Sequence, residues 1–163
     1  MTYRILLERA EMALAFVFEM SYIDTMKKKP NTLLARIKTR ISRKHADVIL
    51  RSDFKDLGDY DQVGRCLLTL IREGTLVKIG QGIYVRAVIS PLDNRPALPK
   101  SLNTLAQEAL KRLDIPTAPT SMERSYNEGR TTQVPAGRVI GVRKRVRRLI
   151  GFNGYSLRFE RTS

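Results

Sequence analysis

The fold is decided between residues 59 and 86, where the chain reads DYDQVGRCLLTLIREGTLVKIGQGIYVR. Asp59 is suited to begin a helix and Gly74 to end one. Between them, apolar residues recur at the i, i+3, i+4, i+7, i+8 spacing of one helix face, at Val63, Cys66, Leu67, Leu70 and Ile71. Two β-rich runs, 75–79 and 83–86, then flank a tight Gly80-Gln81-Gly82 turn. This stretch predicts a helix followed by a β-hairpin.

The residues before this stretch predict two more helices and a short strand. A helix ending near Lys44 is indicated by apolar residues at helical spacing, namely Leu33, Leu34, Ile37 and Ile41. A β-branched run at 47–50 predicts a small strand, and Ser52 and Gly58 bound a brief second helix. The order helix, strand, helix, helix, hairpin is that of a winged helix-turn-helix, which we expect over 31–90.

The C-terminal part predicts a second, small α+β domain over 101–163. Three prolines within 91–100 indicate a linker or a rigid crossing segment before it. Ser101 can cap a helix whose apolar stripe is Leu102, Leu105, Ala106, Ala109, Leu110 and Leu113. A short helix is expected over 120–127, and β-structure at 139–142 and 149–152. Asn153-Gly154 is the preferred two-residue hairpin turn. The fold class is therefore predicted to be α+β.

The first 30 residues read as an N-terminal extension. One helix face carries Ile5, Met12, Phe16 and Met20, so we expect a helix that packs on the body or on a second copy. Four charged residues interrupt the apolar run, which excludes a membrane span, and the signal-peptide pattern is missing. Alternatively, Met26, followed by three lysines, is the natural start. These features predict a cytoplasmic protein without a membrane segment.

The balance of charge points to a polyanionic partner. Thirty Lys and Arg residues oppose sixteen Asp and Glu residues, a formal net charge of +14. Nucleic acid is the commonest partner of so basic a chain. A single cysteine, Cys66, and a single histidine, His45, cannot form an intrachain disulfide or a His/Cys zinc site. No phosphate-binding glycine loop or nucleophile elbow occurs either. We expect no cofactor, no metal and no enzymatic activity.

We expect duplex DNA on the face of the 60–72 helix opposite its apolar stripe. Gln62 and Arg65 are the candidate base readers, because Gln pairs with adenine and Arg with guanine, and a recognition helix enters the groove deepest near its N-terminus. The same face continues through Thr69 and Arg72, and Tyr60 could donate to a phosphate. Contacts to phosphate or the minor groove are expected from Lys78, Gln81 and Arg86 on the hairpin, and from Arg40, Arg43 and Lys44 on the first helix. A solvated polar face is the alternative for each.

A second basic concentration lies near the C-terminus. Between 138 and 163, eight Arg and Lys residues face only Glu160. Five of them fall in six positions, at Arg143, Lys144, Arg145, Arg147 and Arg148, within a segment expected to link two strands. This segment could extend DNA binding, bind RNA, dock an acidic protein or stay a solvated loop.

Two motifs carry a resemblance to a known family. The segment IREGTLVKIGQGIY, Ile71–Tyr84, resembles the helix-end and wing signature of AbiEi-type antitoxins, and TTQVP, Thr131–Pro135, is similar to an element of that family's second domain. The likeness runs from about Leu33 to Phe159. It implies an operon-repressing winged helix, an antitoxin domain and a nucleotidyltransferase-like toxin, antagonised with or without direct contact. Carried over, it places DNA recognition on Gln62, Arg65, Thr69, Lys78 and Gln81.

The sequence thus predicts a transcriptional repressor that binds an inverted repeat in its own operator and acts as the antitoxin of a toxin–antitoxin system. The alternative is an RNA- or protein-binding adaptor that uses Arg143–Arg148 on a winged-helix scaffold. A homodimer would match the two-fold symmetry of an inverted repeat, and monomers binding cooperatively would match it equally well.

Overall fold

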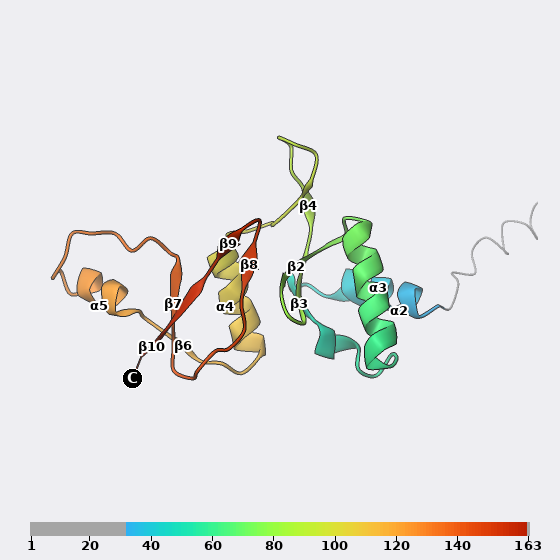
Figure 1. Ribbon diagram of the computed structural model, residues 1–163, viewed down its shortest axis with the longest axis horizontal. Coiled ribbons are helices and arrows are strands. Elements are labelled where there is room, and N and C mark those ends of the chain that lie inside the picture. The colour runs from blue at the N-terminus through green and yellow to red at the C-terminus, as the bar shows by residue number, and fades with distance from the viewer. Residues whose placement is uncertain (1–31, 163) are drawn as a thin grey trace, which may run out of the picture.

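The computed structural model describes residues 32–162, and within this range four α-helices and several small sheets form a mixed α+β fold (Figure 1). The predicted fold class is confirmed at this level. The helix expected within residues 1–30 lies outside the described residues.

The N-terminal half begins with two helices, a strand and a short 3-10 helix, close to the expected order. Its elements are α2 (Leu33–Arg43), β1 (Val48–Leu50), the 3-10 helix η1 (Arg51–Phe54) and α3 (Tyr60–Arg72). Thr32 caps α2 by accepting from the Ala35 N–H at 3.2 Å. The second helix is shorter than expected, a single 3-10 turn. Gly74 follows α3 with φ of 72°, the left-handed conformation that ends many helices.

A three-stranded antiparallel sheet completes this half. After α3 come β2 (Leu76–Gly80) and β3 (Ile83–Arg86), and the strand order is β1-β3-β2. The two long strands are joined by Gln81 and Gly82, and Gly82 takes a φ of 72° that a side chain would strain. The predicted hairpin is therefore present, with its turn one residue tighter than the Gly-Gln-Gly segment.

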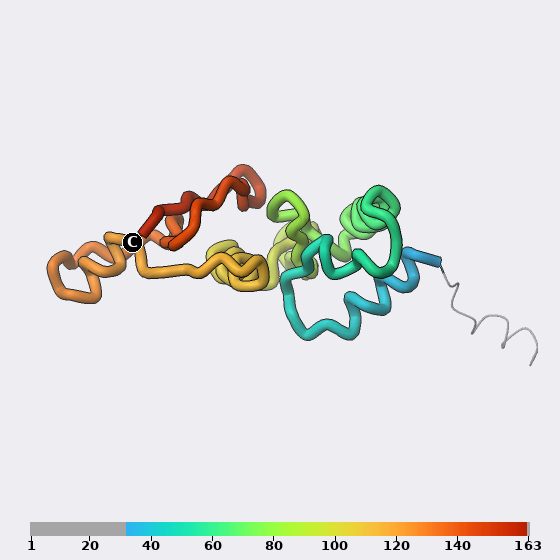
Figure 2. Tube along the Cα trace, turned by 90° about the horizontal axis from the view of Figure 1, so that it is seen from below, coloured from blue at the N-terminus to red at the C-terminus, as the bar shows by residue number. Residues whose placement is uncertain are grey.

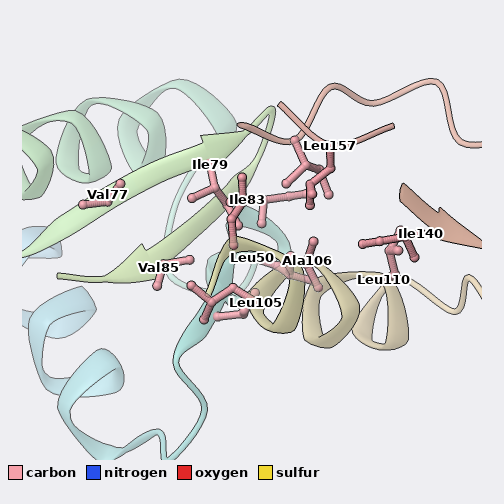
Figure 3. Packing of buried hydrophobic residues seen from close by; sticks show 14 of the residues in the cluster. Leu50, Val77, Ile79, Ile83, Val85, Leu105, Ala106, Leu110, Ile140 and Leu157 are labelled. Atoms are coloured by element: carbon pink, nitrogen blue, oxygen red, sulfur yellow. The ribbon is translucent and has the colours of Figure 1, made fainter. Parts of the chain in front are cut away.

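Both faces of this sheet are buried. Ile49, Leu76 and Tyr84 pack against α2 and α3. The opposite face joins a second cluster through Val48, Leu50, Val77, Ile79, Ile83 and Val85. Figure 3 shows this second face meeting the helix α4 (Leu102–Arg112), where Leu105 and Ala106 point toward the strands. Strands buried on both sides are apolar at almost every position, which explains the runs VIL and IYV.

The C-terminal half combines α4 with one shorter helix and several short strands. It contains β4 (Val88–Ile89), β5 (Pro96–Ala97), β6 (Thr117–Ala118), α5 (Ser121–Asn127), β7 (Val139–Val142), β8 (Gly151–Phe152), β9 (Tyr155–Ser156) and β10 (Arg158–Arg161). One sheet has the order β10-β7-β6, with β10 parallel to β7. Asn153 and Gly154 both have positive φ between β8 and β9, as the predicted hairpin turn requires. The segment expected as a linker or a rigid crossing segment contributes β5 to a small ladder with β4.

The two halves lie end to end in an elongated molecule (Figure 2) and share one hydrophobic core. Ile140, Ile150 and Leu157 of the C-terminal half belong to the same buried cluster as Val77 and Val85 of the sheet. Polar contacts reinforce the junction, since Glu108 accepts from the Val48 N–H and Lys100 pairs with Asp47 at 2.6 Å. The relative position of the halves is thus fixed by packing.

No helix within the described range is both long and apolar enough to cross a bilayer.

Candidate nucleic-acid interface

The outer face of α3 presents the residues that the sequence singled out. Gln62, Arg65 and Arg72 are exposed, whereas Val63, Leu67 and Leu70 on the opposite side are buried. Thr69 is half-buried, and its hydroxyl donates to the Arg65 carbonyl oxygen at 3.1 Å. Because a hydroxyl oxygen keeps lone pairs after donating, Thr69 can still accept a hydrogen bond. The helix therefore carries an unobstructed polar and cationic surface.

Leu68 belongs to this face and was missed by the sequence reasoning. Its side chain is 51% exposed, between Arg65 and Arg72 in the outward helical position. An apolar side chain on an otherwise polar helix face is suited to contact a thymine methyl group. The signal was available, because Leu68 falls outside the i, i+3, i+4 stripe formed by its apolar neighbours.

Arg51 positions the start of α3 and was also missed. Its guanidinium lies 3.4 Å from the centre of the Tyr60 ring and donates to the Tyr60 carbonyl oxygen at 2.6 Å. Gly64 makes room for it, since a Cβ there would lie 2.1 Å from Arg51 Nη2. This explains a glycine inside a helix, which costs about 1 kcal/mol relative to alanine. Tyr60 itself is 68% exposed, so its hydroxyl is available to a ligand.

The hairpin presents its cation and its turn to solvent. Lys78 is exposed in β2 between buried residues, and Gln81 is exposed at the turn. The turn lies close to the beginning of α3, because Gln81, Gly82, Asp59 and Tyr60 line the same hollow, of about 760 Å³. The structure thus brings together the helix and hairpin residues that the sequence grouped.

Three of the predicted phosphate contacts have another role. Arg86 is half-buried and donates to the carbonyl oxygens of Ile41 and Lys44, which caps the end of α2. Arg40 makes a bidentate ion pair with Asp56, in which Arg40 Nη2 lies 2.8 Å from Asp56 Oδ2. Lys44 lies 3.0 Å from the Asp53 carboxylate. The donors of Arg86, Arg40 and Lys44 stabilise the N-terminal half, and their predicted contacts with phosphate stay predictions.

Asp53 is the centre of that internal network. Its carboxylate accepts from the Leu50 N–H at 2.9 Å, from Lys44 at 3.0 Å and from Arg112 at 2.6 Å. Although burial raises the pKa of Asp53, the Leu50 hydrogen bond and the Lys44 and Arg112 cations outweigh it and hold the pKa below its ordinary value. Asp53 therefore stays ionised and fixes η1 between α2 and α4.

The remaining cations near the interface are not neutralised within residues 32–162. Arg65, Arg72 and Lys78 are exposed and form no ion pair there, and the same holds for Arg43 at the end of α2. Glu73, the acidic residue directly after Arg72, already has a partner, since it pairs with Lys38 at 2.8 Å. The structure thus separates cations that stabilise the fold from cations open to a ligand.

The second basic segment, Arg143–Arg148, connects β7 to β8, as expected, and we call it the basic loop. All five of its cations are exposed, and Val146 between them packs against the core. At its end, Arg148 donates from Nη1 to the Gln81 carbonyl oxygen at 3.1 Å. The two basic regions, distant in the sequence, therefore meet at the hairpin turn.

The single cysteine and the single histidine lie in surroundings that indicate no catalytic or metal-binding role. Cys66 is half-buried against the helix cluster, and burial raises the pKa of its thiol, as suits the core residue expected from the sequence. His45 is exposed after α2. Within residues 32–162, no three His, Cys, Asp or Glu side chains gather closely enough to hold a metal ion.

Comparison with known proteins identifies a family. No match was found among curated proteins or among solved structures. A family model described as a family of unknown function, DUF6088, matches residues 35–163, which covers both halves and the whole shared core. The chain therefore belongs to the DUF6088 family.

Proposed function

We propose that this protein is a duplex-DNA-binding transcriptional regulator whose N-terminal half is a winged helix-turn-helix. The observation that carries the proposal is the exposed face of α3 with Gln62, Arg65, Leu68 and Arg72, beside a hairpin that exposes Lys78 and Gln81. The supporting fold features are the order α2-β1-η1-α3-β2-β3 and the pairing of β1 with β3. A helix with this free face fits the major groove, which is about 12 Å wide.

The roles follow from the chemistry of each side chain. Arg65 and Gln62 read base edges, Leu68 contacts thymine methyl groups, and Tyr60 and Lys78 bind phosphate. Asp61 is exposed in the first turn of α3 and can accept from the cytosine amino group. A mixed face of this kind is better suited to sequence readout than a uniformly cationic face.

The proposal is tested by selecting bound sequences from a random duplex pool and then comparing a selected duplex with a scrambled one by fluorescence anisotropy. Wild type should prefer the selected duplex by at least about a thousandfold near 0.15 M salt. Arg65→Ala should lose about 10- to 100-fold on the selected duplex and little on the scrambled one. Lys78→Ala should weaken both equally and lower the salt slope by about one.

The matched control is Arg124→Ala, which removes one exposed positive charge from α5, at the end of the molecule opposite α3 (Figure 1). It should change neither affinity nor slope. Equal wild-type affinity for selected and scrambled duplexes would refute sequence-specific regulation.

The antitoxin role is a further proposal, supported by the resemblance at Ile71–Tyr84 and Thr131–Pro135. Thr131–Pro135 lies in the loop between α5 and β7, and Val134 is 69% exposed and open to a partner. Co-expression with the product of the adjacent gene tests it. Rescue of growth from a toxic nucleotidyltransferase-like product supports the role, and unchanged toxicity contradicts it.

A further inference from the structure

We infer that the basic loop, Arg143–Arg148, and the hairpin turn form one composite surface that binds the backbone phosphates of the duplex read by α3. This inference rests on the proposed function. It assigns the C-terminal half a direct part in DNA binding, as a second contact beside the hairpin.

The loop is fixed to the hairpin at its C-terminal end. Arg148 donates to the Gln81 carbonyl oxygen, and Ile150 forms an isolated antiparallel bridge with Gly80. Gly80 permits this close approach, because a Cβ there would lie 3.0 Å from the Leu149 carbonyl oxygen. The basic loop is therefore anchored to the same hairpin that flanks α3.

Two further anchors hold the loop in place. It leaves β7 directly after Val142, which is 1% exposed, and Val146 in its middle packs against the core. An anchored loop has given up much of its conformational freedom before any ligand arrives, so less entropy remains to be lost on binding. A solvated basic tail would need none of these anchors.

The charge of the loop is uncompensated within the described part of the chain. Five of its six residues are cationic and exposed, and none of the five takes part in an ion pair among residues 32–162. Like charges held so close together repel one another, and the ordered core around Val146 prevents them from spreading. A polyanion is the partner that relieves this repulsion.

The position of the loop selects duplex DNA among polyanions. Arg148 borders the hollow that also contains Tyr60 and Lys55, and it borders the groove of about 1480 Å³ that contains Lys78 and Arg147 on the other side of the turn. Cations therefore continue from the start of α3, across the turn, to the basic loop. A phosphate backbone that passes α3 would meet the loop next.

The test compares two variants that each remove three positive charges. The loop variant is Arg143→Gln/Lys144→Gln/Arg145→Gln. The control is Arg124→Gln/Arg130→Gln/Arg158→Gln, at exposed positions on α5, just after it and at the start of β10, away from α3 (Figure 1). The slope of log affinity against log salt falls by about 0.9 for each phosphate that the protein no longer neutralises. We expect the slope of the loop variant to fall by about two to three on selected and scrambled duplexes alike. The control should keep the wild-type slope.

A third variant separates the placement of the charge from its amount. Gly80→Ala keeps every cation but crowds the Leu149 carbonyl oxygen, so the loop shifts away from the turn. We expect hydroxyl-radical footprints of the loop variant and of Gly80→Ala to lose protection at the same flanking backbone positions, with the selected sequence still preferred over the scrambled one.

The outcomes are distinguishable from failure of the proposed function. If the loop variant and the control change the slope equally, or neither changes it, the inference is wrong while sequence-specific binding by α3 stands. If wild type shows no sequence preference but only the loop variant has a reduced slope, the regulator proposal fails, and the part of the inference that stands is that the loop binds duplex phosphates. If structured RNA competes better than duplex and the loop variant alone loses that advantage, the inference is overturned in favour of RNA.

Discussion

Arg112 on α4 places its Nη2 2.6 Å from Oδ1 of Asp53 on η1, and its Nη1 donates to the Val48 carbonyl oxygen at 2.6 Å. The two side chains are only 24% and 11% exposed. One guanidinium thus joins α4 to β1 and η1, the strand and the 3-10 turn that precede α3. The orientation of α3 is therefore coupled to the C-terminal half.

Replacing Asp53 with Asn should make unfolding less dependent on pH. Because the folded state holds the pKa of Asp53 below its unfolded value, near 3.8, the carboxylate stabilises the fold above that value, and this stabilisation is lost as pH falls through the folded pKa. Near neutral pH, Asp53→Asn should lower the free energy of unfolding by about 1–3 kcal/mol. Denaturant unfolding at a series of pH values between about 7 and about 3 measures this difference.

The difference between wild type and Asp53→Asn should shrink below about pH 4. The matched control is Asp61→Asn, whose carboxylate is exposed and forms no ion pair among residues 32–162. It should leave the curve near that of wild type. An Asp53→Asn difference that stays constant with pH would show that the network acts through packing alone.

Replacing Leu105 with Ala should destabilise both halves together. Leu105 is fully buried in the cluster that contains strand residues of the N-terminal half and Ile140 of the C-terminal half. We expect stability to fall by about 2–5 kcal/mol, with hydrogen-exchange protection disappearing from α3 and β7 in one transition. Leu92→Ala, at a side chain 96% exposed, is the control. If one half became unprotected before the other, the halves would be two independent units.

Alanine substitutions at the adjacent residues Leu67 and Leu68 should have different effects, the first on stability and the second on DNA binding. Leu67 is fully buried and Leu68 is 51% exposed. Leu67→Ala should cost about 2–5 kcal/mol of stability. Leu68→Ala should leave thermal unfolding unchanged but weaken binding to a selected duplex about tenfold, most at sites rich in thymine. If Leu68→Ala binds every duplex as wild type does, this position lies outside the interface.

Alanine substitutions at Arg86 and at Lys78 should affect different properties, the first the stability of the fold and the second DNA binding. Arg86→Ala leaves the end of α2 without its cap, so we expect stability to fall by about 1–3 kcal/mol, with the salt slope of DNA binding retained. Lys78→Ala should leave stability unchanged and lower the salt slope of DNA binding, since Lys78 is exposed and forms no ion pair among the described residues. A lowered slope in Arg86→Ala would show that Arg86 also contacts DNA.

The elements that sequence predicted best are those with strong local signals. The helix over 60–72, the Gly82 turn, the Ser101 cap and the Asn153-Gly154 turn each depend on a few neighbouring residues and were found where expected. Long-range features left no such signal. The parallel pairing of β10 with β7 joins residues about twenty positions apart, and the two-residue strand β6 is too short for periodicity to reveal.

The site was predicted in part for the same reason. Exposure of Arg65 and Lys78 follows from helix and strand periodicity, which a sequence contains. Periodicity does not reveal whether a cation is free or paired, because the partners are distant in the sequence. Asp56 lies sixteen positions from Arg40, and Arg86 caps a helix more than forty positions away. The meeting of Arg148 with Gln81, over sixty positions apart, was equally invisible.

The most direct measurement is the map of backbone amide chemical-shift changes when the full chain is titrated with a selected duplex. We expect changes concentrated at α3, at the turn around Gln81 and at the basic loop, with α5 unaffected. Changes confined to α5 and the loop after it, with no change at α3, would contradict the central claim that α3 enters the groove of DNA.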